Sequence, residues 1–317
     1  MKKAFVISGG AGRVMCAIPA LERYAQKHDD FVIVAEGWME VFSGSPLLRD
    51  KVFHVMHNRL FEEHLKDCEI ITPEPYRFNP YFNQKCNLIQ AFDMIINELD
   101  EVPHTDKITM ELSKKEQIDG HGIVQEVRSV MGKEKVIVFQ PFGSGVTQTT
   151  NFLYDTSGRS FELLDITRLI EELKKDYGII LMSQYPIDAD NKLGIAWPQN
   201  TGIRDWMGII NAADYFLGCD SLGQHIAYSL NKPATVVIGS TFPENISYPD
   251  VNNFDVIDVG GEKRKYAPFR ITHDDNIERN NEGLMVLNDD QFKQIVNSVK
   301  QRLTTTVDVK TKLEAKK

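Results

Sequence analysis

Cysteine is scarce in this sequence, and long apolar runs are missing. Only four of the 317 residues are cysteines, and no two of them form a Cys-x-x-Cys pair. This spacing argues against a disulfide framework or a thiolate metal site, so we expect four reduced thiols. No stretch approaches the ~20 apolar residues that span a bilayer. The apolar run at residues 4–7 is too short for a signal peptide, and we expect a cytoplasmic protein with no membrane span.

Positive charge is also in short supply. The net charge is -9 and the pI is about 5.4. Proteins that bind nucleic acid through phosphate contacts are usually basic, so we expect nucleic acid as a partner only in the form of a modified-base acceptor. Asp188-Ala-Asp190 has the spacing of a cation-binding triplet but lies in a polar loop. We therefore expect no metal.

Short apolar runs alternate with amphipathic segments along most of the chain. Strands that are apolar on both faces and alternate with helices predict an α/β fold with parallel sheets covered on both sides. The expected strands are residues 3–7, 31–35, 52–55, 68–71, 136–139, 178–182, 215–218 and 234–238, and the expected helices are residues 14–27, 88–99, 161–175, 206–213, 221–230 and 289–303.

The length is typical of two domains, and each half is long enough to bury its own core. Between residues 113 and 135 the chain becomes polar and charged, with glycines at 120, 122 and 132, and the strand–helix pattern then restarts. We place the boundary there. The predicted parts are a first domain at 1–120, a linker at 121–134, a second domain at 135–303 and a polar tail at 304–317.

A glycine-rich turn joins the first expected strand to the first helix. It reads Ser8-Gly-Gly-Ala-Gly-Arg13 and lacks the spacing of the dinucleotide fingerprint. Gly10 and Gly12 would let a ligand approach the backbone at a helix start, and Arg13 could clamp a phosphate or a sugar carboxylate. A tight turn that binds nothing is the alternative.

The second half has a comparable loop after its first strand. It begins Gln140-Pro-Phe-Gly143-Ser144-Gly145, continues with threonines at 147, 149 and 150, and reaches Arg159 just before a helix. Hydroxyls, backbone amides and one arginine beside a helix start suit a pyrophosphate. A polar surface loop is the alternative.

The most specific motif lies where the strand at 215–218 meets the next helix. It contains Asp220, Ser221, Gly223, Gln224 and His225. Asp220 or Ser221 would cap the helix, whose first amides would face the carboxyl edge of the sheet, where open α/β sheets bind ligands. A half-buried structural histidine is the alternative for His225.

Two further segments have a composition that suits ligand contacts. The loop Gly239-Ser-Thr241-Phe-Pro243 follows the strand after this motif, beside the same expected edge. A basic and aromatic run from Glu262 through Arg270 to His273 could meet an anionic acceptor, although such a run is more often a solvated loop.

Taken in order, these motifs resemble the lipopolysaccharide heptosyltransferases, family 9 of the glycosyltransferases. The resemblance rests on the glycine turn with Pro19-Ala-Leu21, on Gly143-Ser144 with Arg159 and Phe161, and most specifically on residues 218–243. It implies a GT-B fold, in which two Rossmann-like domains face each other across a cleft. It further implies a metal-independent glycosyltransferase without a cofactor, whose substrate is a nucleotide sugar and whose acceptor is unknown.

The resemblance also implies roles for particular residues. The donor-binding set is Gly143, Ser144, Asp220, Ser221, Gly223, Gln224, Thr241 and Pro243, the acceptor side has Gly10 and Gly12, and the catalytic set is Arg159, His225, Arg13 and Glu36. The sequence departs from the family in two places. Leu222 stands where the family has glycine, and Arg13 stands where it has the aspartate proposed as base, which leaves Glu36 and Glu74 as candidate bases.

Three other functions stay open at this point. A binding protein on a catalytically decayed GT-B frame would explain Arg13. A related enzyme could epimerise or hydrolyse a nucleotide sugar. A modified base in DNA could be the acceptor, contacted by residues 263–270.

Overall fold

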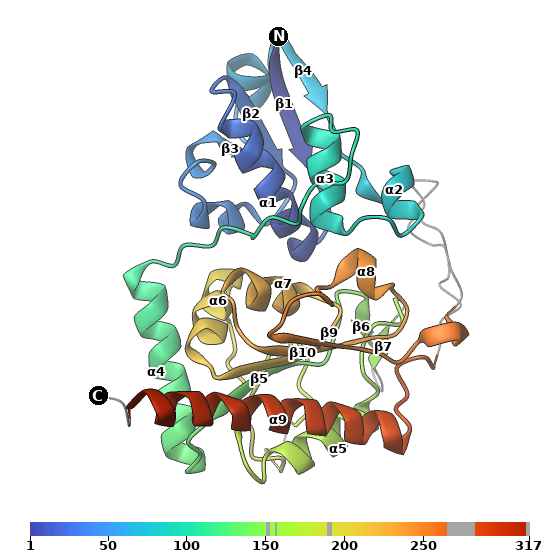
Figure 1. The fold of residues 1–317 in the computed structure, drawn as a ribbon. Helices are drawn as coiled ribbons and strands as arrows, with labels where there is room; N and C mark the ends of the chain where they lie inside the picture. The colour runs from blue at the N-terminus through green and yellow to red at the C-terminus, as the bar shows by residue number, and fades with distance from the viewer. Residues whose placement is uncertain (150–152, 156, 189–191, 265–282, 315–317) are drawn as a thin grey trace. The chain divides into compact units, whose positions relative to one another are not determined.

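The computed structural model describes residues 1–149, 153–155, 157–188, 192–264 and 283–314, with side chains given up to 304. Figure 1 shows the ribbon. Contacts divide the chain into two compact units, described separately below. Unit 1 comprises Met1–Ser113 together with Glu244–Ile246, and unit 2 comprises the other described residues.

Unit 1 is built on a four-stranded parallel sheet with the order β3-β2-β1-β4. The strands are β1 (Lys2–Ile7), β2 (Phe31–Ala35), β3 (Val52–His54) and β4 (Cys68–Ile71), and the helices are α1 (Ala11–Ala25), α2 (Asn79–Phe82) and α3 (Leu88–Ile96). Helices α1 and α3 pack against each other. Phe5 of β1 meets Tyr24 of α1 edge to face, with ring centroids 4.9 Å apart. Short helical turns η1 (Met39–Gly44), η2 (Arg49–Lys51), η3 (Phe61–Leu65) and η4 (Pro75–Arg77) complete the connections.

Unit 2 has a five-stranded parallel sheet with the order β11-β10-β9-β5-β8. The strands are β5 (Val136–Gln140), β8 (Gly178–Leu181), β9 (Tyr215–Cys219), β10 (Ala234–Ile238) and β11 (Phe254–Asp258), and the helices are α4 (Lys114–Met131), α5 (Leu163–Leu173), α6 (Ile203–Ala212), α7 (Leu222–Ser229) and α9 (Asp289–Glu314). A hairpin of β6 (Val146–Gln148) and β7 (Leu153–Asp155) follows β5. Helix α8 (Pro243–Ile246) follows β10 along the chain, but Glu244–Ile246 belong to unit 1.

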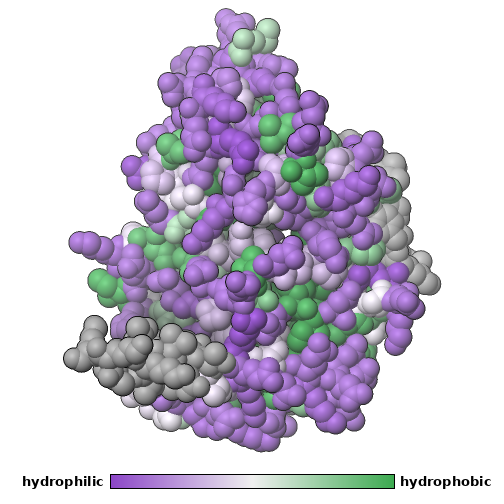
Figure 2. Space-filling view, in the orientation of Figure 1, coloured by the Kyte–Doolittle hydropathy of each residue, from purple (hydrophilic) through white to green (hydrophobic). Residues whose placement is uncertain are grey.

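Both faces of the unit 2 sheet are buried, as its apolar strands predict. Every residue of β5, β9 and β10 is buried. On one face, Phe139 and Leu217 share a core with Ile170 of α5 and Val299 of α9, and α5 and α9 lie together on this side in Figure 1. The side of the molecular surface that Figure 2 shows is mostly polar, and its apolar residues form small patches. In the described part of the chain, no helix is both long enough and apolar enough to cross a membrane.

The expected linker at 121–134 lies largely within a helix. Helix α4 occupies Lys114–Met131 and belongs to unit 2, because it packs closely on α6. A side chain at Gly120 would reach within 2.3 Å of the Gly208 backbone. Gly120 therefore permits a close helix crossing and does not interrupt the helix, which composition alone could not reveal.

The other expected strands and helices are confirmed with shifts of a few residues at their ends, except that α9 extends through Glu314 and so includes most of the expected polar tail. The sequence analysis missed β11 and the β6–β7 hairpin. Parallel sheets confirm the α/β class. The arrangement of two domains across a cleft stays a prediction.

Candidate functional site

The unit 2 sheet brings the predicted donor motifs to one edge. Strand β5 lies between β8 and β9, and the chain runs from β5 to β8 before it crosses to β9. The order of the strands therefore reverses between β5 and β9, and ligands bind at such switch points in open α/β sheets. Gln140 ends β5, Asp220 follows β9 and Thr241 lies shortly after β10, so topology alone places these three at the same carboxyl edge.

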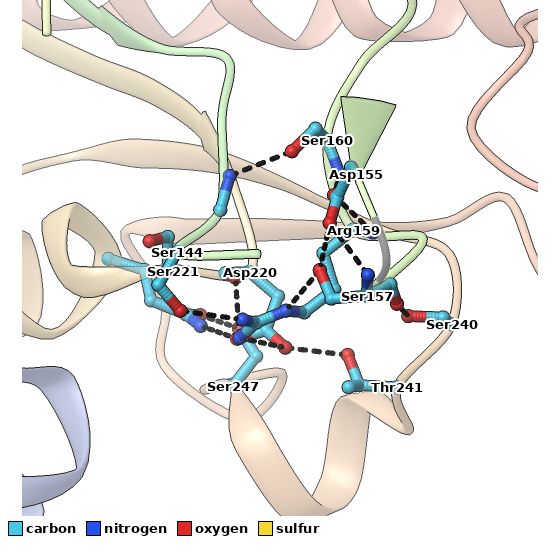
Figure 3. Close-up of polar contacts among 12 residues, drawn as sticks. Ser144, Asp155, Ser157, Arg159, Ser160, Asp220, Ser221, Ser240, Thr241 and Ser247 are labelled. Carbon is cyan, nitrogen blue, oxygen red and sulfur yellow. Dashed lines mark hydrogen bonds and ion pairs between the residues drawn. The ribbon is translucent and has the colours of Figure 1, made fainter. Parts of the chain in front are cut away.

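Arg159 occupies the centre of this edge. Its Nε donates to Ser157 Oγ at 3.1 Å, its Nη2 to Ser144 Oγ at 3.0 Å and its Nη1 to the Asp220 carbonyl at 3.4 Å. Its Nη1 also lies 3.9 Å from the Asp220 carboxylate, and the side chain is 21% exposed. Figure 3 shows the guanidinium within this set of hydroxyls and acids. The guanidinium is thus held from several sides while solvent can still reach it.

Asp155 holds the backbone turn that presents Arg159. Its carboxylate accepts from the amides of Ser157, Arg159 and Ser160 at 2.7, 3.0 and 2.8 Å, and from Ser157 Oγ at 2.5 Å. Burial is the largest effect on its pKa and opposes ionisation, but the hydrogen bonds from Ser157 and Ser160 together outweigh it and lower the pKa. Asp155 is therefore a fixed anion that shapes the loop beneath Arg159.

Asp220 is the second acid at this edge, and it is buried. Its side chain is 3% exposed and accepts from Gln224 Nε2 and from Thr241 Oγ1, both at 2.7 Å. Gln224 in turn accepts from Ser247 Oγ at 2.8 Å. Asp220 thus connects β9, α7 and the loop after β10, and its proximity to Arg159 helps to orient the guanidinium.

The start of α7 differs from the expectation in its hydrogen bonding. Ser221 is the N-cap residue, but its side chain makes no cap bond and instead accepts from Gln140 Nε2 at 3.1 Å. Gln140 Oε1 accepts a hydrogen bond from the Gly223 amide at 2.7 Å. The Gly223 amide, expected to face a phosphate, is therefore used within the protein. A side chain there would meet Gln140 Oε1 at 2.5 Å and the Phe216 ring at 2.4 Å, which accounts for glycine at this position.

His225 also differs from its expected role. It is 3% exposed, and its Nδ1 lies 2.7 Å from the Tyr248 hydroxyl. Burial, and secondarily the charge of Arg159, lower its pKa to about 3. The imidazole is neutral and enclosed in this structure, so it does not offer the positive charge that a phosphate contact would use.

The remaining predicted donor residues lie near this cluster. Gly143 donates its amide to Ser160 Oγ at 2.9 Å, and a side chain on Gly143 would contact Arg159 at 3.5 Å. Pro243 is buried at the start of α8. Thr150 and Asp190 lie outside the described residues.

In unit 1, the predicted acceptor-side residues also lie at a switch point, between β1 and β4. Gly9 has φ +96°, a conformation that glycine adopts readily. Gly10 is the exposed N-cap of α1, and Gly12 lies in its first turn. Glu36 is exposed just after β2. The glycine turn is thus open to a ligand from one side.

Arg13 is turned into unit 1 and is only 7% exposed. Its Nη2 donates to the Pro73 carbonyl at 3.1 Å and to Glu74 at 3.3 Å, and its guanidinium carbon lies 5.0 Å from the centre of the Tyr76 ring. The expected clamp on a phosphate or sugar is therefore not the state seen here. Arg13 instead fixes Glu74, whose side chain is 30% exposed and also accepts from the Tyr76 amide at 3.2 Å.

The sequence analysis did not assign a role to Asp155, Ser157, Gln140, Ser247 or Tyr248. Asp155 and Ser157 could have been found from the run of polar residues before Arg159. Gln140, Ser247 and Tyr248 are distant in sequence from the α7 residues they contact, so no local pattern identifies them.

The basic run after β11 is described only up to Arg264, and its residues 265–273 lie outside the described part. The Arg264 side chain is 3% exposed. It donates to the Gly239 carbonyl at 2.7 Å, pairs with Asp258 and stacks on Phe242. Arg264 therefore braces the loop after β10 and is not the solvent-facing cation that contact with an acceptor would require.

Comparison with solved structures shows what the chain resembles. The family 9 glycosyl transferase of Veillonella parvula aligns over 96% of this chain and 97% of its own, with TM-score 0.63 and 12% identity. ADP-heptose LPS heptosyltransferase II of E. coli aligns over 96% and 99%, with the same score and identity. E. coli heptosyltransferase WaaC, solved with ADP, aligns over 82% and 94%, with TM-score 0.53 and 15% identity.

By sequence, no protein-family model and no curated protein matches the chain. The structural likeness is established at the level of the fold. The chain has the GT-B-like α/β fold of the family 9 glycosyltransferases, and the resemblance noted in its sequence motifs is confirmed at that level.

Proposed function

We propose that this protein is a glycosyltransferase that moves a sugar from a nucleoside-diphosphate donor to a hydroxyl acceptor. The observation that carries the proposal is the Arg159 cluster: a partly exposed guanidinium, held by Ser144, Ser157 and Asp220 at the switch point of the unit 2 sheet. The proposal is supported by the fold, which is similar to that of two solved family 9 glycosyltransferases.

The cluster suits a diphosphate because it offers both charge and hydrogen-bond donors. A guanidinium can pair with two phosphate oxygens at once. The hydroxyls of Ser144 and Ser221 each accept a bond from the protein and retain their own O–H to donate. Leu222, the first residue of α7, has an N–H that no intrahelical bond uses. Arg159 would neutralise the departing diphosphate, and transfer would need no metal ion.

The acceptor would be bound by unit 1, beside the glycine turn. Deprotonation of its hydroxyl needs a base, and Glu74 suits this task better than Glu36, because Arg13 and the Tyr76 amide hold its carboxylate in place. Arg13 would then be a positioning residue. We also propose that the two units close around donor and acceptor. The proposed location is the cytoplasm.

A series of nucleotides that differ by one phosphate tests the proposal. Thermal unfolding is followed with adenosine, AMP and ADP, and then with UDP, GDP and CDP. ADP is the first choice because the E. coli WaaC structure contains it. A ligand at 100 times its Kd stabilises the native state by about 2.7 kcal/mol. We expect ADP, or one of the other diphosphates, to raise Tm, and ADP to raise it more than AMP if adenine is the preferred base. The proposal is contradicted if no nucleoside diphosphate raises Tm, or if the preferred diphosphate raises it no more than its own monophosphate.

A second candidate is a nucleotide-binding protein without transferase activity. The buried Arg13, in place of the aspartate that the family motif implies, favours it. Incubation with ADP-heptose and other nucleotide sugars separates the two. Release of the nucleoside diphosphate with a sugar-bearing product supports transfer, whereas binding with no turnover supports the alternative. Product formed without any acceptor would indicate hydrolysis or epimerisation.

A further inference from the structure

Three of the eight histidines lie close together in sequence in unit 1: His54 ends β3, and His57 and His64 lie in the connection between β3 and β4. Within the described residues, the ligand atoms of His57, Glu63 and His64 all lie within 4.8 Å of one another. The spacing His-x5-Glu-His matches none of the metal motifs considered above. The group lies on unit 1 and contains none of the residues assigned to sugar transfer.

The backbone bends to bring these side chains together. After β3, the His57 amide donates to the His54 carbonyl at 2.8 Å, and Arg59 adopts φ +58°, which returns the chain toward its start. Glu63 and His64 then lie in η3, a single turn of π-helix. Such turns are rare.

One aromatic ring supports both histidines. Phe53 of β3 stacks on His64, with ring centroids 3.8 Å apart and planes inclined by 27°. His57 lies 5.3 Å from Phe53 and 5.5 Å from His64. Packing against a common ring restricts both imidazoles before any ligand arrives, which lowers the entropy lost on binding.

The contacts that compete with a metal are weak. Glu63 is paired with Arg59 at 3.4 Å, and these side chains are 45% and 64% exposed. Exposed pairs of this kind contribute about 0.2–1 kcal/mol, far less than coordination to a transition metal. Cys68 is close in sequence, but its Sγ donates to the His64 carbonyl at 3.2 Å.

We propose that His57, Glu63 and His64 form a binding site for a divalent transition-metal cation of the Zn²⁺ class. Two imidazole nitrogens and one carboxylate oxygen make a typical zinc set, and water would fill the open position. Metal bonds of about 2.1 Å place tetrahedral ligands about 3.4 Å apart, so the ligand atoms need to approach one another by up to about 1.4 Å. The cation would link the turn after β3 to η3. The proposed site does not depend on the proposed sugar transfer.

The test is isothermal titration of the tag-free, chelator-treated full chain with Zn²⁺. We expect one saturable site. His57→Ala and His64→Ala should each weaken it by at least about a hundredfold, since even outer-shell changes cost 10–100-fold. His121→Ala, at an exposed histidine of α4, is the matched control and should bind as the wild type does. Arg59→Ala should bind at least as tightly, because it removes the competitor of Glu63.

Co²⁺ identifies the ligand atoms. Binding through nitrogen and oxygen gives no thiolate charge-transfer band, and Cys68→Ser should retain the site. The proposal is overturned if the wild type shows no saturable Zn²⁺ binding, if His121→Ala loses as much affinity as the two ligand variants, or if Cys68→Ser abolishes binding. Circular dichroism confirms that each variant is folded.

Discussion

Replacing Arg159 with alanine removes the charge at the centre of the proposed diphosphate site. A hydrogen bond to a charged group contributes about 1.5–3 kcal/mol. Since about 1.4 kcal/mol corresponds to a tenfold change in affinity, we expect the Kd for the best nucleoside diphosphate to rise by about 10- to 150-fold. Affinity for the corresponding nucleoside, which has no phosphate, should hardly change.

The fold should survive this substitution. Arg159 donates to Ser144, Ser157 and the Asp220 carbonyl, but at 21% exposure water can replace part of these bonds. The Asp220 carboxylate keeps its bonds from Gln224 and Thr241. We therefore expect a loss of only about 1–2 kcal/mol in the free energy of unfolding.

Two further variants separate charge from position. Arg159→Lys keeps the charge but loses the planar fork, so its affinity should lie between those of the wild type and the alanine variant. Arg168→Ala is the matched control, because Arg168 is likewise a partly exposed arginine that pairs with acids, Asp165 and Asp289, but it lies on α5. The assay is calorimetric titration at one fixed salt concentration. Unchanged affinity in Arg159→Ala, or an equal loss in Arg168→Ala, would refute the reasoning.

Three other predictions address the remaining structural arguments. Gly223→Ala should destabilise the fold by about 1–3 kcal/mol in urea melts, because its methyl group would overlap an aromatic ring; Gly122→Ala, with open space around it, should not destabilise. Glu74→Gln should lower kcat by about 10²–10⁴-fold while donor affinity is retained, whereas Glu36→Gln should leave kcat nearly unchanged. His225 has a pKa of about 3 when folded, and the unfolded chain binds this proton near pH 6.5. The free energy of unfolding should therefore fall as pH drops from about 6.5 toward 3, by at most about 1.4 kcal/mol per pH unit from this group, and His225→Gln should lose that part of the slope.

The sequence predicted the parallel sheets because buried strands carry their own signature. Phe31–Ala35 is apolar at every position and Ala234–Ile238 at every position but Thr235, and both lie inside a sheet as expected. Strand β11 was missed because it lies at the sheet edge and is only partly buried, with Asp255 and Asp258 interrupting its apolar run. Gly120 of α4 was misleading because it makes a close contact with Gly208 of α6, a residue distant in sequence.

The sequence predicted several residues of the candidate site but not all of their hydrogen-bond partners. Asp220, Arg159 and Ser144 meet as expected, since strand order brings their loops to one edge. The partners of Gly223 and Arg13 could not be predicted. Gln140 reaches Gly223 from 83 positions away, and Glu74 reaches Arg13 from 61, so both contacts depend on the packing of separate strands.

These internal contacts change which groups can balance a bound diphosphate. The amide of Gly223 is bonded to Gln140, and His225 is neutral and enclosed, so neither adds positive charge at the edge of the sheet. Arg159 then carries most of that task, with single donors from Ser144 and Ser221. A neutral hydroxyl contributes about 0.5–1.5 kcal/mol. Loss of either serine should therefore weaken diphosphate binding less than loss of Arg159. In a site based mainly on backbone amides, by contrast, replacing any of these three side chains would change the affinity little.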